Sequence, residues 1–277
     1  MSRSILITGC SSGIGRACAL GMKARGWQVY ASARSQDDLD DLAAEGLVPV
    51  HLDYADPESI AACATSVLQA TDNKIDALFN NGAYGQLGAV EDLPTEALRR
   101  QFETNLFGWH DLTLRLLPSM QARRSGRIVQ CSSVLGLVAM KFRGAYVASK
   151  YALEGLTDCL RLELRGTGVH VSLIEPGPIE SRFTTNAVKA FDAAIDVDAS
   201  RFRHAYIKRR RQLLEGGASR FKLGPEAVLE RLIHATESRN PKPRYAVTTP
   251  TFVMDGLRRA LPTRLLDALA ARISESN

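Results

Sequence analysis

Short runs of apolar and β-branched residues alternate along the chain with longer stretches in which apolar residues recur every three or four positions. The short runs are typical of buried strands and the longer stretches of amphipathic helices. Near-continuous apolar strands separated by helices predict a doubly wound, mostly parallel α/β sheet of Rossmann-like type, covered on both faces. The predicted strands cover residues 4–8, 27–32, 47–53, 74–80, 126–133, 168–177 and 243–249.

One internal segment departs from this alternation. Residues 182–224 follow the sixth predicted strand, lack strand signals and are rich in Arg, Ala and Asp. An insertion at the carboxyl end of a strand is well placed to cover a ligand, so we expect a helical lid there. Its larger apolar residues fit a pocket lining and core packing equally well; they are Phe183, Phe191, Phe202, Tyr206, Leu213 and Leu214.

The C-terminal residues 251–277 form an amphipathic extension to the α/β domain of residues 1–250. Arginines alternate with an apolar stripe, and Pro262 interrupts it, so we expect two short helices. We expect the stripe to face protein, over the pocket or on a neighbouring subunit; the alternative is peripheral contact with an anionic membrane. The stripe consists of Phe252, Leu257, Leu261, Leu265, Leu266 and Leu269.

Composition adds limits to this picture. The chain has 277 residues, of which 45% are hydrophobic and 23% charged, which suits one globular domain. Five scattered cysteines and five unclustered histidines argue against a disulfide framework and a metal site. We find no signal segment and no apolar run long enough for a membrane span, so we expect a cytoplasmic protein that is not integral to a membrane.

The net charge is +5, and part of it comes from the run "KRRR" at Lys208–Arg211. A nucleic-acid site is one interpretation of such a run. Because no aromatic residues are interleaved with the charges, a solvated helix face is favoured, and we expect no nucleic-acid partner.

The first predicted strand runs into "TGCSSGIG", Thr8 to Gly15. Glycine permits positive φ and close backbone approach, and the N-terminus of the helix that follows offers free N–H groups to an anion. A plain strand–helix turn would need only one glycine. Gly9, Gly13 and Gly15, with Ser11 and Ser12, therefore predict a phosphate-binding loop in the first βα unit.

The end of the second strand bears on the choice of cofactor. An NAD site usually has an acid there, which binds the ribose 2′-hydroxyl. This chain has Arg34 instead, and a guanidinium can bind a 2′-phosphate that a carboxylate would repel. Asp37 and Asp38 fit the first turn of the next helix. The sequence therefore favours NADP(H).

Tyr146 and Lys150 lie in the helix-forming segment "AYVASKYALEG", residues 145–155. A spacing of four places both side chains on one helix face, one turn apart. Many surface helices carry such a pair by chance. A nearby cation, however, lowers the pKa of a phenol, whose ordinary value is about 10, so the pair is a candidate for proton transfer.

Together these motifs resemble the short-chain dehydrogenase/reductase family over about residues 3–250. The glycine pattern TGxxxGxG is matched at residues 8–15, and the YxxxK pair at Tyr146 and Lys150. Further matches in the expected order are Asp53 after the third strand, Asn105 with Gly108, Ser133 thirteen residues before Tyr146, and Pro176 with Gly177 after the sixth strand. Each motif alone is weak, but six in register are a specific signal.

Within the family, the chain is most similar to the NADP-dependent branch acting on steroids, retinoids and other lipophilic alcohols and carbonyls. It is closer still to bacterial aldehyde-reductase-like members. The stretches that carry this similarity are "TGCSSGIG", "YVASKYALEG" and "SLIEPGPIESRF". The resemblance implies hydride transfer between NADP(H) and a lipophilic aldehyde, ketosteroid or retinoid-like substrate. It also implies a homodimer or homotetramer, paired through the helix of Tyr146 and the helix that ends near Met120. A non-catalytic dinucleotide sensor is the alternative; a missing catalytic residue would favour it, and none is missing.

The resemblance also assigns roles to individual residues. Tyr146 exchanges a proton with the substrate oxygen, and Lys150 lowers the pKa of Tyr146 and binds the nicotinamide ribose. Ser133 donates to the substrate oxygen, with Ser132 as its rival and helix capping as its other interpretation. Asn105 holds a water in a proton relay, kinks its helix by bonding the backbone, or does both.

The remaining implied contacts belong to the cofactor. Pro176 and Gly177 turn the chain under the nicotinamide, and Ile179 and Ser181 bond its carboxamide. One departure from the family is that the usual NNAG reads NNGA at residues 80–83, which leaves the backbone conformation there an open question. The cofactor-binding residues implied are Gly9, Ser11, Ser12, Gly13, Ile14, Gly15, Arg34, Asp53, Asn81, Tyr146, Lys150, Pro176, Gly177, Ile179 and Ser181.

Overall fold

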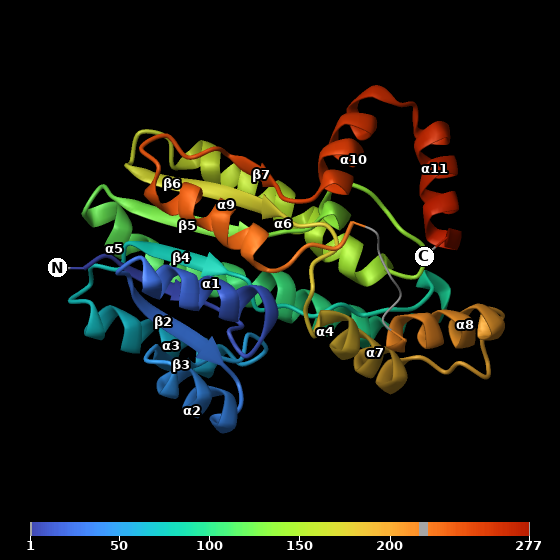
Figure 1. Ribbon diagram of the computed structural model, residues 1–277, viewed down its shortest axis with the longest axis horizontal. Helices are drawn as coiled ribbons and strands as arrows, with labels where there is room; N and C mark the ends of the chain where they lie inside the picture. Colours follow the sequence, from blue (N-terminus) through green and yellow to red (C-terminus); the bar gives the residue numbers. More distant parts are fainter. Residues whose placement is uncertain (1, 216–220, 277) are drawn as a thin grey trace.

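The computed structural model describes residues 2–215 and 221–276. All seven predicted strands form, and they make one parallel sheet in the order β3-β2-β1-β4-β5-β6-β7 (Figure 1). The order reverses between β1 and β4, which creates a crevice at the carboxyl edge of the sheet. The strands are β1 (Ser4–Ile7), β2 (Gln28–Ala33), β3 (Val48–His51), β4 (Ala77–Asn80), β5 (Gly126–Cys131), β6 (Val169–Glu175) and β7 (Arg244–Ala246).

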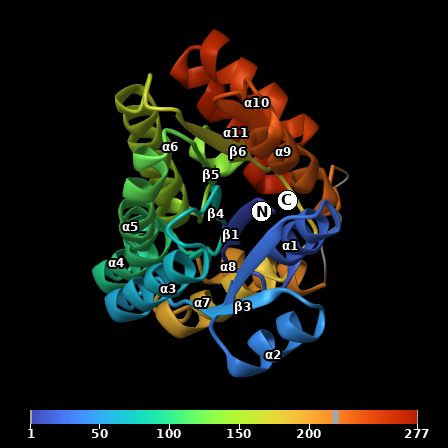
Figure 2. The same cartoon turned by 90° about the vertical axis from the view of Figure 1, so that its left-hand side faces the viewer.

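Helices cover both faces of the sheet, so the fold is the single-domain, Rossmann-like α/β architecture that the sequence predicts (Figure 2). One face is covered by α3 (Pro57–Ala70), α5 (Gly108–Ala122) and α6 (Gly144–Glu163); the other is covered by α1 (Gly13–Ala24) and α9 (Glu226–Glu237), while α2 (Gln36–Ala44) packs beside β2 and β3.

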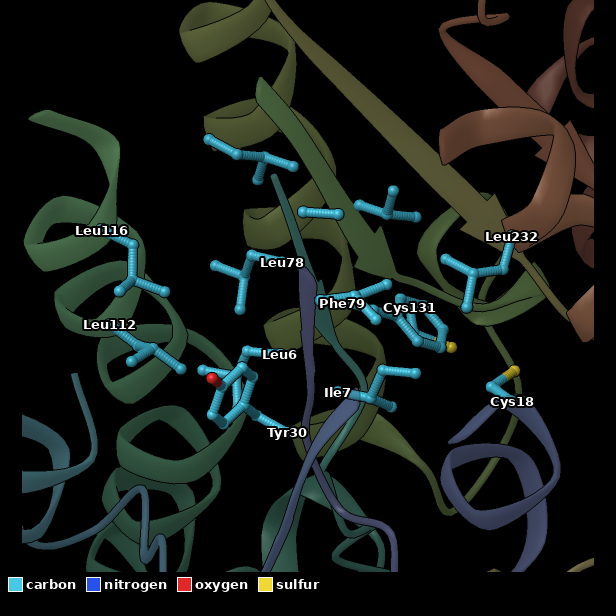
Figure 3. Packing of buried hydrophobic residues seen from close by; sticks show 14 of the residues in the cluster. Leu6, Ile7, Cys18, Tyr30, Leu78, Phe79, Leu112, Leu116, Cys131 and Leu232 are labelled. Carbon is cyan, nitrogen blue, oxygen red and sulfur yellow. The ribbon is translucent and has the colours of Figure 1, made fainter. Parts of the chain in front are cut away.

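The core has two layers, because successive side chains along each strand point to opposite faces of the sheet. Leu6 and Leu78 point toward α5, whereas their neighbours Ile7 and Phe79 point toward α1 and α9 (Figure 3). All four side chains are fully buried. Because both faces of the sheet are covered, successive strand residues are apolar, and this is the continuous pattern seen in the sequence.

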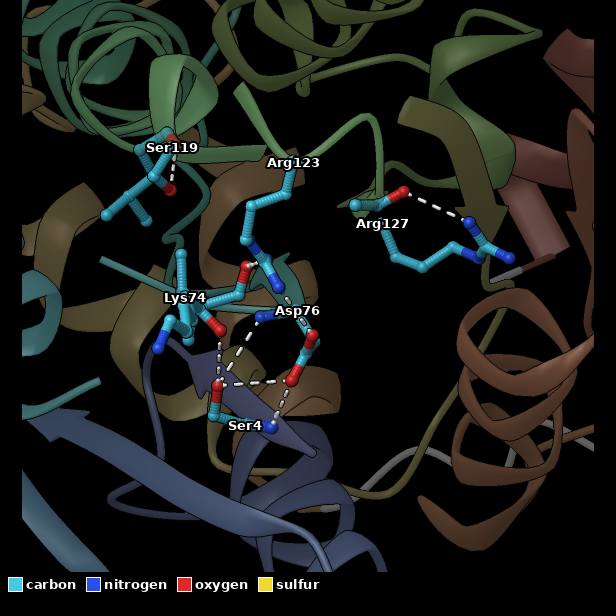
Figure 4. A network of polar contacts seen from close by, with 9 residues as sticks. Ser4, Lys74, Asp76, Ser119, Arg123 and Arg127 are labelled. Atoms are coloured by element: carbon cyan, nitrogen blue, oxygen red, sulfur yellow. Dashed lines mark hydrogen bonds and ion pairs between the residues drawn. The ribbon is translucent and has the colours of Figure 1, made fainter. Parts of the chain in front are cut away.

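A polar network fastens the amino-terminal edge of the sheet (Figure 4). The Asp76 carboxylate accepts hydrogen bonds from the Ser4 backbone N–H (2.8 Å) and from Arg123 Nη1 (3.1 Å). These bonds join β1, the start of β4 and the end of α5. The network lies opposite the carboxyl edge, so it supports the sheet without entering the crevice.

The lid and the tail gather at the carboxyl edge (Figure 1). The lid segment contains α7 (Phe183–Ala194) and α8 (Arg203–Leu214); its residues 216–220 lie outside the described part of the chain. The tail forms α10 (Thr249–Ala260) and α11 (Thr263–Ser276), separated at Pro262 as predicted. Within the described residues no helix is long and apolar enough to cross a membrane.

Candidate active site

The glycine loop packs directly against the loop after β4. Gly9 has φ +70°, and a Cβ at this position would lie 2.5 Å from Cα of Gly82. The Thr8 hydroxyl holds the two loops together, because it accepts hydrogen bonds from the backbone N–H groups of Asn81 (2.8 Å) and Gly82 (3.0 Å). Asn81 also donates through Nδ2 to the Thr8 carbonyl (2.9 Å).

This packing answers the question raised by the NNGA departure. Gly82 does not have a positive φ, so its role is proximity rather than an unusual backbone conformation. A Cβ on Gly82 would lie 3.2 Å from N and 3.3 Å from Cα of Gly9, which is tighter than most real contacts. Gly82 therefore permits the close approach of two backbones beside the predicted cofactor site.

The start of α1 is suited to a phosphate. Ser12 occupies the N-cap position, but its side chain makes no capping hydrogen bond, and the first turn carries no acid. The first N–H groups and the positive end of the helix dipole are thus left for an external anion. Close packing around Gly9, Gly13 and Gly15 holds the loop backbone tightly against its neighbours at this end of the helix. These features fit the pyrophosphate of a dinucleotide.

The residues predicted to bind the adenosine half lie at neighbouring strand ends. Arg34 is exposed directly after β2 and forms no ion pair in the described part of the chain. Asp37 and Asp38 lie in the first turn of α2, as predicted, and the Ser35 side chain caps that helix by accepting from the Asp38 N–H. Asp53 follows β3, and its Oδ1 accepts from the Ala55 N–H (2.9 Å).

Tyr146 and Lys150 are both buried and lie on the same side of α6. Lys150 Nζ donates to the Cys131 carbonyl (2.8 Å) at the end of β5 and lies 5.7 Å from the centre of the Tyr146 ring. It also lies 4.2 Å from the centre of the Trp109 ring, where a cation is attracted to the aromatic face. Burial lowers the pKa of Lys150 to about 8.

Ser133 is the serine that interacts with Tyr146. Burial raises the pKa of the Tyr146 phenol, and a hydrogen bond with the Ser133 side chain opposes that shift. Ser133 is also the cap of a short 3-10 turn, with Oγ accepting from the Leu135 N–H (3.1 Å). Ser132 Oγ is buried and has no hydrogen-bond partner among the described residues. The preference for Ser133 over Ser132 as the serine that binds a substrate stays a prediction.

Asn105 sits in a π-helical turn, Glu103–Phe107, between α4 (Thr95–Phe102) and α5. Its side chain bonds the backbone of Tyr84 twice: Nδ2 donates to the carbonyl (2.8 Å) and Oδ1 accepts from the N–H (3.2 Å). The side chain therefore bonds the backbone of another segment rather than that of its own helix, and the predicted role in kinking the helix stays a prediction although the winding at Asn105 is π-helical. The predicted role in a proton relay stays a prediction.

The loop after β6 reaches both the serine turn and the glycine loop. The Pro176 carbonyl accepts from the Val134 N–H (2.8 Å) beside Ser133. Ser181 is exposed, accepts through Oγ from the Phe183 N–H (3.3 Å) and lies against Gly13, whose added Cβ would be 2.7 Å from Ser181 Cβ. Ile179 is half-buried and pairs with Leu223 as an isolated parallel bridge. Gly177 passes so close to Thr248 that a Cβ would be 2.1 Å from its Oγ1.

Sequence reasoning did not find Trp109, and although it named Phe183 as a lid residue, it did not find the contact of Phe183 with Tyr146. Trp109 covers the Lys150 ammonium and donates through Nε1 to the Gly82 carbonyl (2.8 Å). Phe183 packs edge-on against Tyr146, with ring centres 5.3 Å apart. The spacing of Trp109 one turn after Asn105 was an available signal, whereas the contact of Phe183 depends on how the lid folds back.

Most of the large apolar residues predicted for the lid lie in one hydrophobic cluster. Phe191, Phe202, Tyr206 and Leu213 join Phe142 in a second hydrophobic cluster, and part of it surrounds an apolar cavity of about 20 Å³, room for roughly one water. Tyr206 also donates to Asp92 Oδ2 (2.5 Å). Leu214 is more than half exposed and belongs to neither hydrophobic cluster of the protein.

A buried ion network lies behind the site and was also missed. Arg244 on β7 contacts Glu154 of α6, Glu175 of β6 (2.7 Å) and Asp158 of α6 (2.7 Å). Burial raises the pKa of Glu175 to about 7, and the neighbouring Glu154 adds to the shift. The network fastens the helix of Tyr146 to the strand that precedes the Pro176 loop.

Comparison with known families and proteins agrees with this geometry. Residues 3–191 match the family model described as short chain dehydrogenase. The chain is 44% identical over 269 residues to an uncharacterized oxidoreductase, YbbO, of Escherichia coli K12, with 97% of this chain and 94% of that protein covered. It is 33% identical to bovine retinol dehydrogenase 8, with 89% and 82% covered.

Solved structures give the same result. A short-chain dehydrogenase from Streptomyces avermitilis superposes with a TM-score of 0.79 at 30% identity, over 99% of this chain and 96% of that one. Actinorhodin polyketide ketoreductase, solved with NADPH, superposes with a TM-score of 0.72 at 26% identity, over 89% and 95%.

Proposed function

Because the chain belongs to the short-chain dehydrogenase family, we propose that this oxidoreductase uses NADP(H) to interconvert a lipophilic carbonyl compound and its alcohol. The observation that carries the proposal is the juxtaposition of Ser133, Tyr146 and Lys150 at the carboxyl edge of the sheet. This group lies beside a glycine loop that fits a pyrophosphate.

In this proposal a bound nicotinamide supplies or accepts the hydride, and the side chains handle the proton. In carbonyl reduction the Tyr146 hydroxyl gives its proton to the substrate oxygen as charge develops there. Burial raises the pKa of Tyr146, which keeps the phenol protonated, as a proton donor must be. Ser133 donates a second hydrogen bond to the same oxygen, and the Lys150 ammonium stabilises the phenolate that remains.

The choice of NADP(H) rests on Arg34. Its exposed guanidinium follows β2, where the ribose 2′ position of a dinucleotide is expected, and no carboxylate competes for it in the described part of the chain. Asp37 and Asp38 are used in the first turn of α2. The NADPH complex of the polyketide ketoreductase is consistent with this choice.

The lipophilic substrate is supported by the side chains above Tyr146. Phe183 contacts the Tyr146 ring, and Phe191 of the same helix, α7, belongs to the second hydrophobic cluster. The name of the retinol dehydrogenase relative points to the same class of substrate.

The test is an NADPH-oxidation screen over aldehydes, ketosteroids and retinal, with NADH alongside. We expect turnover with at least one apolar carbonyl compound and its loss in Tyr146→Phe, while NADPH affinity stays nearly the same because the ring still packs. NADPH binding without turnover on any substrate would favour the dinucleotide sensor. Retention of more than a few per cent of kcat in Tyr146→Phe would contradict the role of the phenol.

A further inference from the structure

The lid is rich in arginine, and most of its arginines on the outer surface are paired with acids. Arg201 pairs with Glu91 (2.5 Å), Arg203 with Asp198 (2.8 Å) and Arg210 with Asp192 (2.8 Å). Arg209, in the middle of the "KRRR" run, differs from these because it is half-buried and bonds the tail at Ser274 instead of an acid. The run is therefore not simply a solvated helix face.

Arg209 lines the apolar cavity between α7 and α8, together with Phe142 and Leu213. Its Nη1 donates to the Ser274 carbonyl near the end of α11 (2.9 Å). That bond is its one hydrogen bond to the described residues, and no carboxylate there pairs with it. Burial lowers the pKa of Arg209, and among the described residues no carboxylate offsets this cost.

Arg143 is a second arginine of this kind. It occupies the N-cap position of α6, three residues before Tyr146. Its Nε is buried and has no hydrogen-bond partner, and within the described residues its guanidinium forms no ion pair. Burial and the charge of Arg209 lower the pKa of Arg143 to about 10, so the two guanidiniums are close enough to repel each other.

The position of the pair connects it to the reaction. Arg143 begins α6 three residues before Tyr146, and its backbone forms an isolated bridge with Gly88, which lines the same cavity as Arg209. The charge of Arg143 also opposes the rise in the pKa of the Tyr146 phenol. Phe142, next to Arg143, packs edge-on against Phe202 and Tyr206. A ligand that extends from Tyr146 toward the lid would thus meet apolar walls and two cations that pair with no carboxylate of the described residues.

We propose that Arg143 and Arg209 together bind a carboxylate of the substrate, so that the preferred substrates are apolar aldehydes or ketones that also carry an acid group. A carboxylate between the two guanidiniums removes their repulsion and supplies acceptors that the described residues do not provide, and the planar fork of arginine suits carboxylate geometry. This inference rests on the proposed carbonyl-reducing function and names its substrate class.

The experiment compares oxo carboxylic acids of several chain lengths with their methyl esters, which differ in charge and little else. The readout is the ratio of kcat/KM for each acid to that for its ester. We expect a ratio well above one for the unaltered protein. Arg143→Met and Arg209→Met should each lower it about 10- to 100-fold, the value of a charge-assisted hydrogen bond in a partly buried site.

Two further variants separate charge recognition from structural damage. Arg209→Lys keeps the charge and should keep part of the acid preference. Arg211→Met makes the same change on an exposed arginine of the same helix and should leave the ratio unchanged. A ratio near one in the unaltered protein would overturn the proposal. So would variants that slow acid and ester equally, including an Arg143→Met whose pH profile shifts for both, because Arg143 would then act only on Tyr146.

If no carbonyl compound is turned over, the proposed function fails, and binding decides the present inference separately. An aliphatic dicarboxylate and its dimethyl ester would be titrated against protein fluorescence, with NADPH present. Tighter binding of the dicarboxylate that is lost in Arg209→Met would support the arginine site. Equal binding of the two compounds would overturn it.

Discussion

Replacing Gly9 with Ala tests how the glycine loop is built. Gly9 has φ +70°, and an added Cβ would lie 2.5 Å from Cα and 3.0 Å from N of Gly82, both backbone atoms. The left-handed conformation costs Ala about 1–2 kcal/mol, and the stiffer unfolded chain returns about 0.4–1 kcal/mol. Overpacking adds about 1–3 kcal/mol. We therefore expect Gly9→Ala to lower the free energy of unfolding by about 1–5 kcal/mol.

Gly26→Ala is the matched control. Gly26 has φ +81°, but its added Cβ would meet no atom within 4 Å, so this variant carries the backbone cost without the clash. Gly9→Ala should then melt about 2–12 °C below Gly26→Ala, the thermal equivalent of about 1–3 kcal/mol. The assay is thermal unfolding followed by circular dichroism, with NADPH titrations of both variants. Equal melting temperatures would refute the argument that Gly9 is needed for the approach of Gly82.

The other predictions concern the cofactor, the lysine and the tail. Arg34→Ala should weaken NADPH binding by about 1.5–3 kcal/mol and NADH binding far less; equal losses in parallel titrations would show that Arg34 does not contact a 2′-phosphate. Because burial lowers the pKa of Lys150 to about 8, its ammonium is lost as the pH rises through 8, so kcat/KM should fall above that pH; a flat profile up to pH 10 would contradict this role. Deleting residues 252–277 should lower solubility and raise KM for large apolar substrates with little change in NADPH affinity, because α10 and α11 lie over the carboxyl edge; unchanged kinetics with loss of vesicle binding would instead indicate a peripheral membrane role.

The sheet and its covering helices could be predicted because their signals are local. Apolar runs indicated the strands, and the acids Asp37 and Asp38 indicated the first turn of α2. The two tail helices followed from Pro262. Periodicity could not show which way the apolar stripe of the tail faces, because Phe252 and Leu265 are more than half exposed although the other members of the stripe are half-buried.

In the candidate site, too, local spacing predicted some neighbours and could not predict others. Tyr146 and Lys150 share one helix, so their spacing alone predicted their proximity. The contacts of Trp109 with Lys150 and of Phe183 with Tyr146 join segments that are 41 and 37 residues apart. Such contacts depend on tertiary packing, which no pattern in a single sequence reports.

The π turn at Asn105 has a consequence for the length of the chain. A helix turns by about 100° per residue, and a π turn holds one residue more than an α turn in the same space. Removing one residue from Glu103–Phe107 would therefore restore ordinary winding without turning α5, so that Trp109 would stay over the Lys150 ammonium and Leu112 in the core. Such a deletion would change the turn itself, where Asn105 bonds the Tyr84 backbone. The fold should thus tolerate a one-residue deletion here, whereas the same deletion inside α5 would rotate every later side chain of that helix by about 100°.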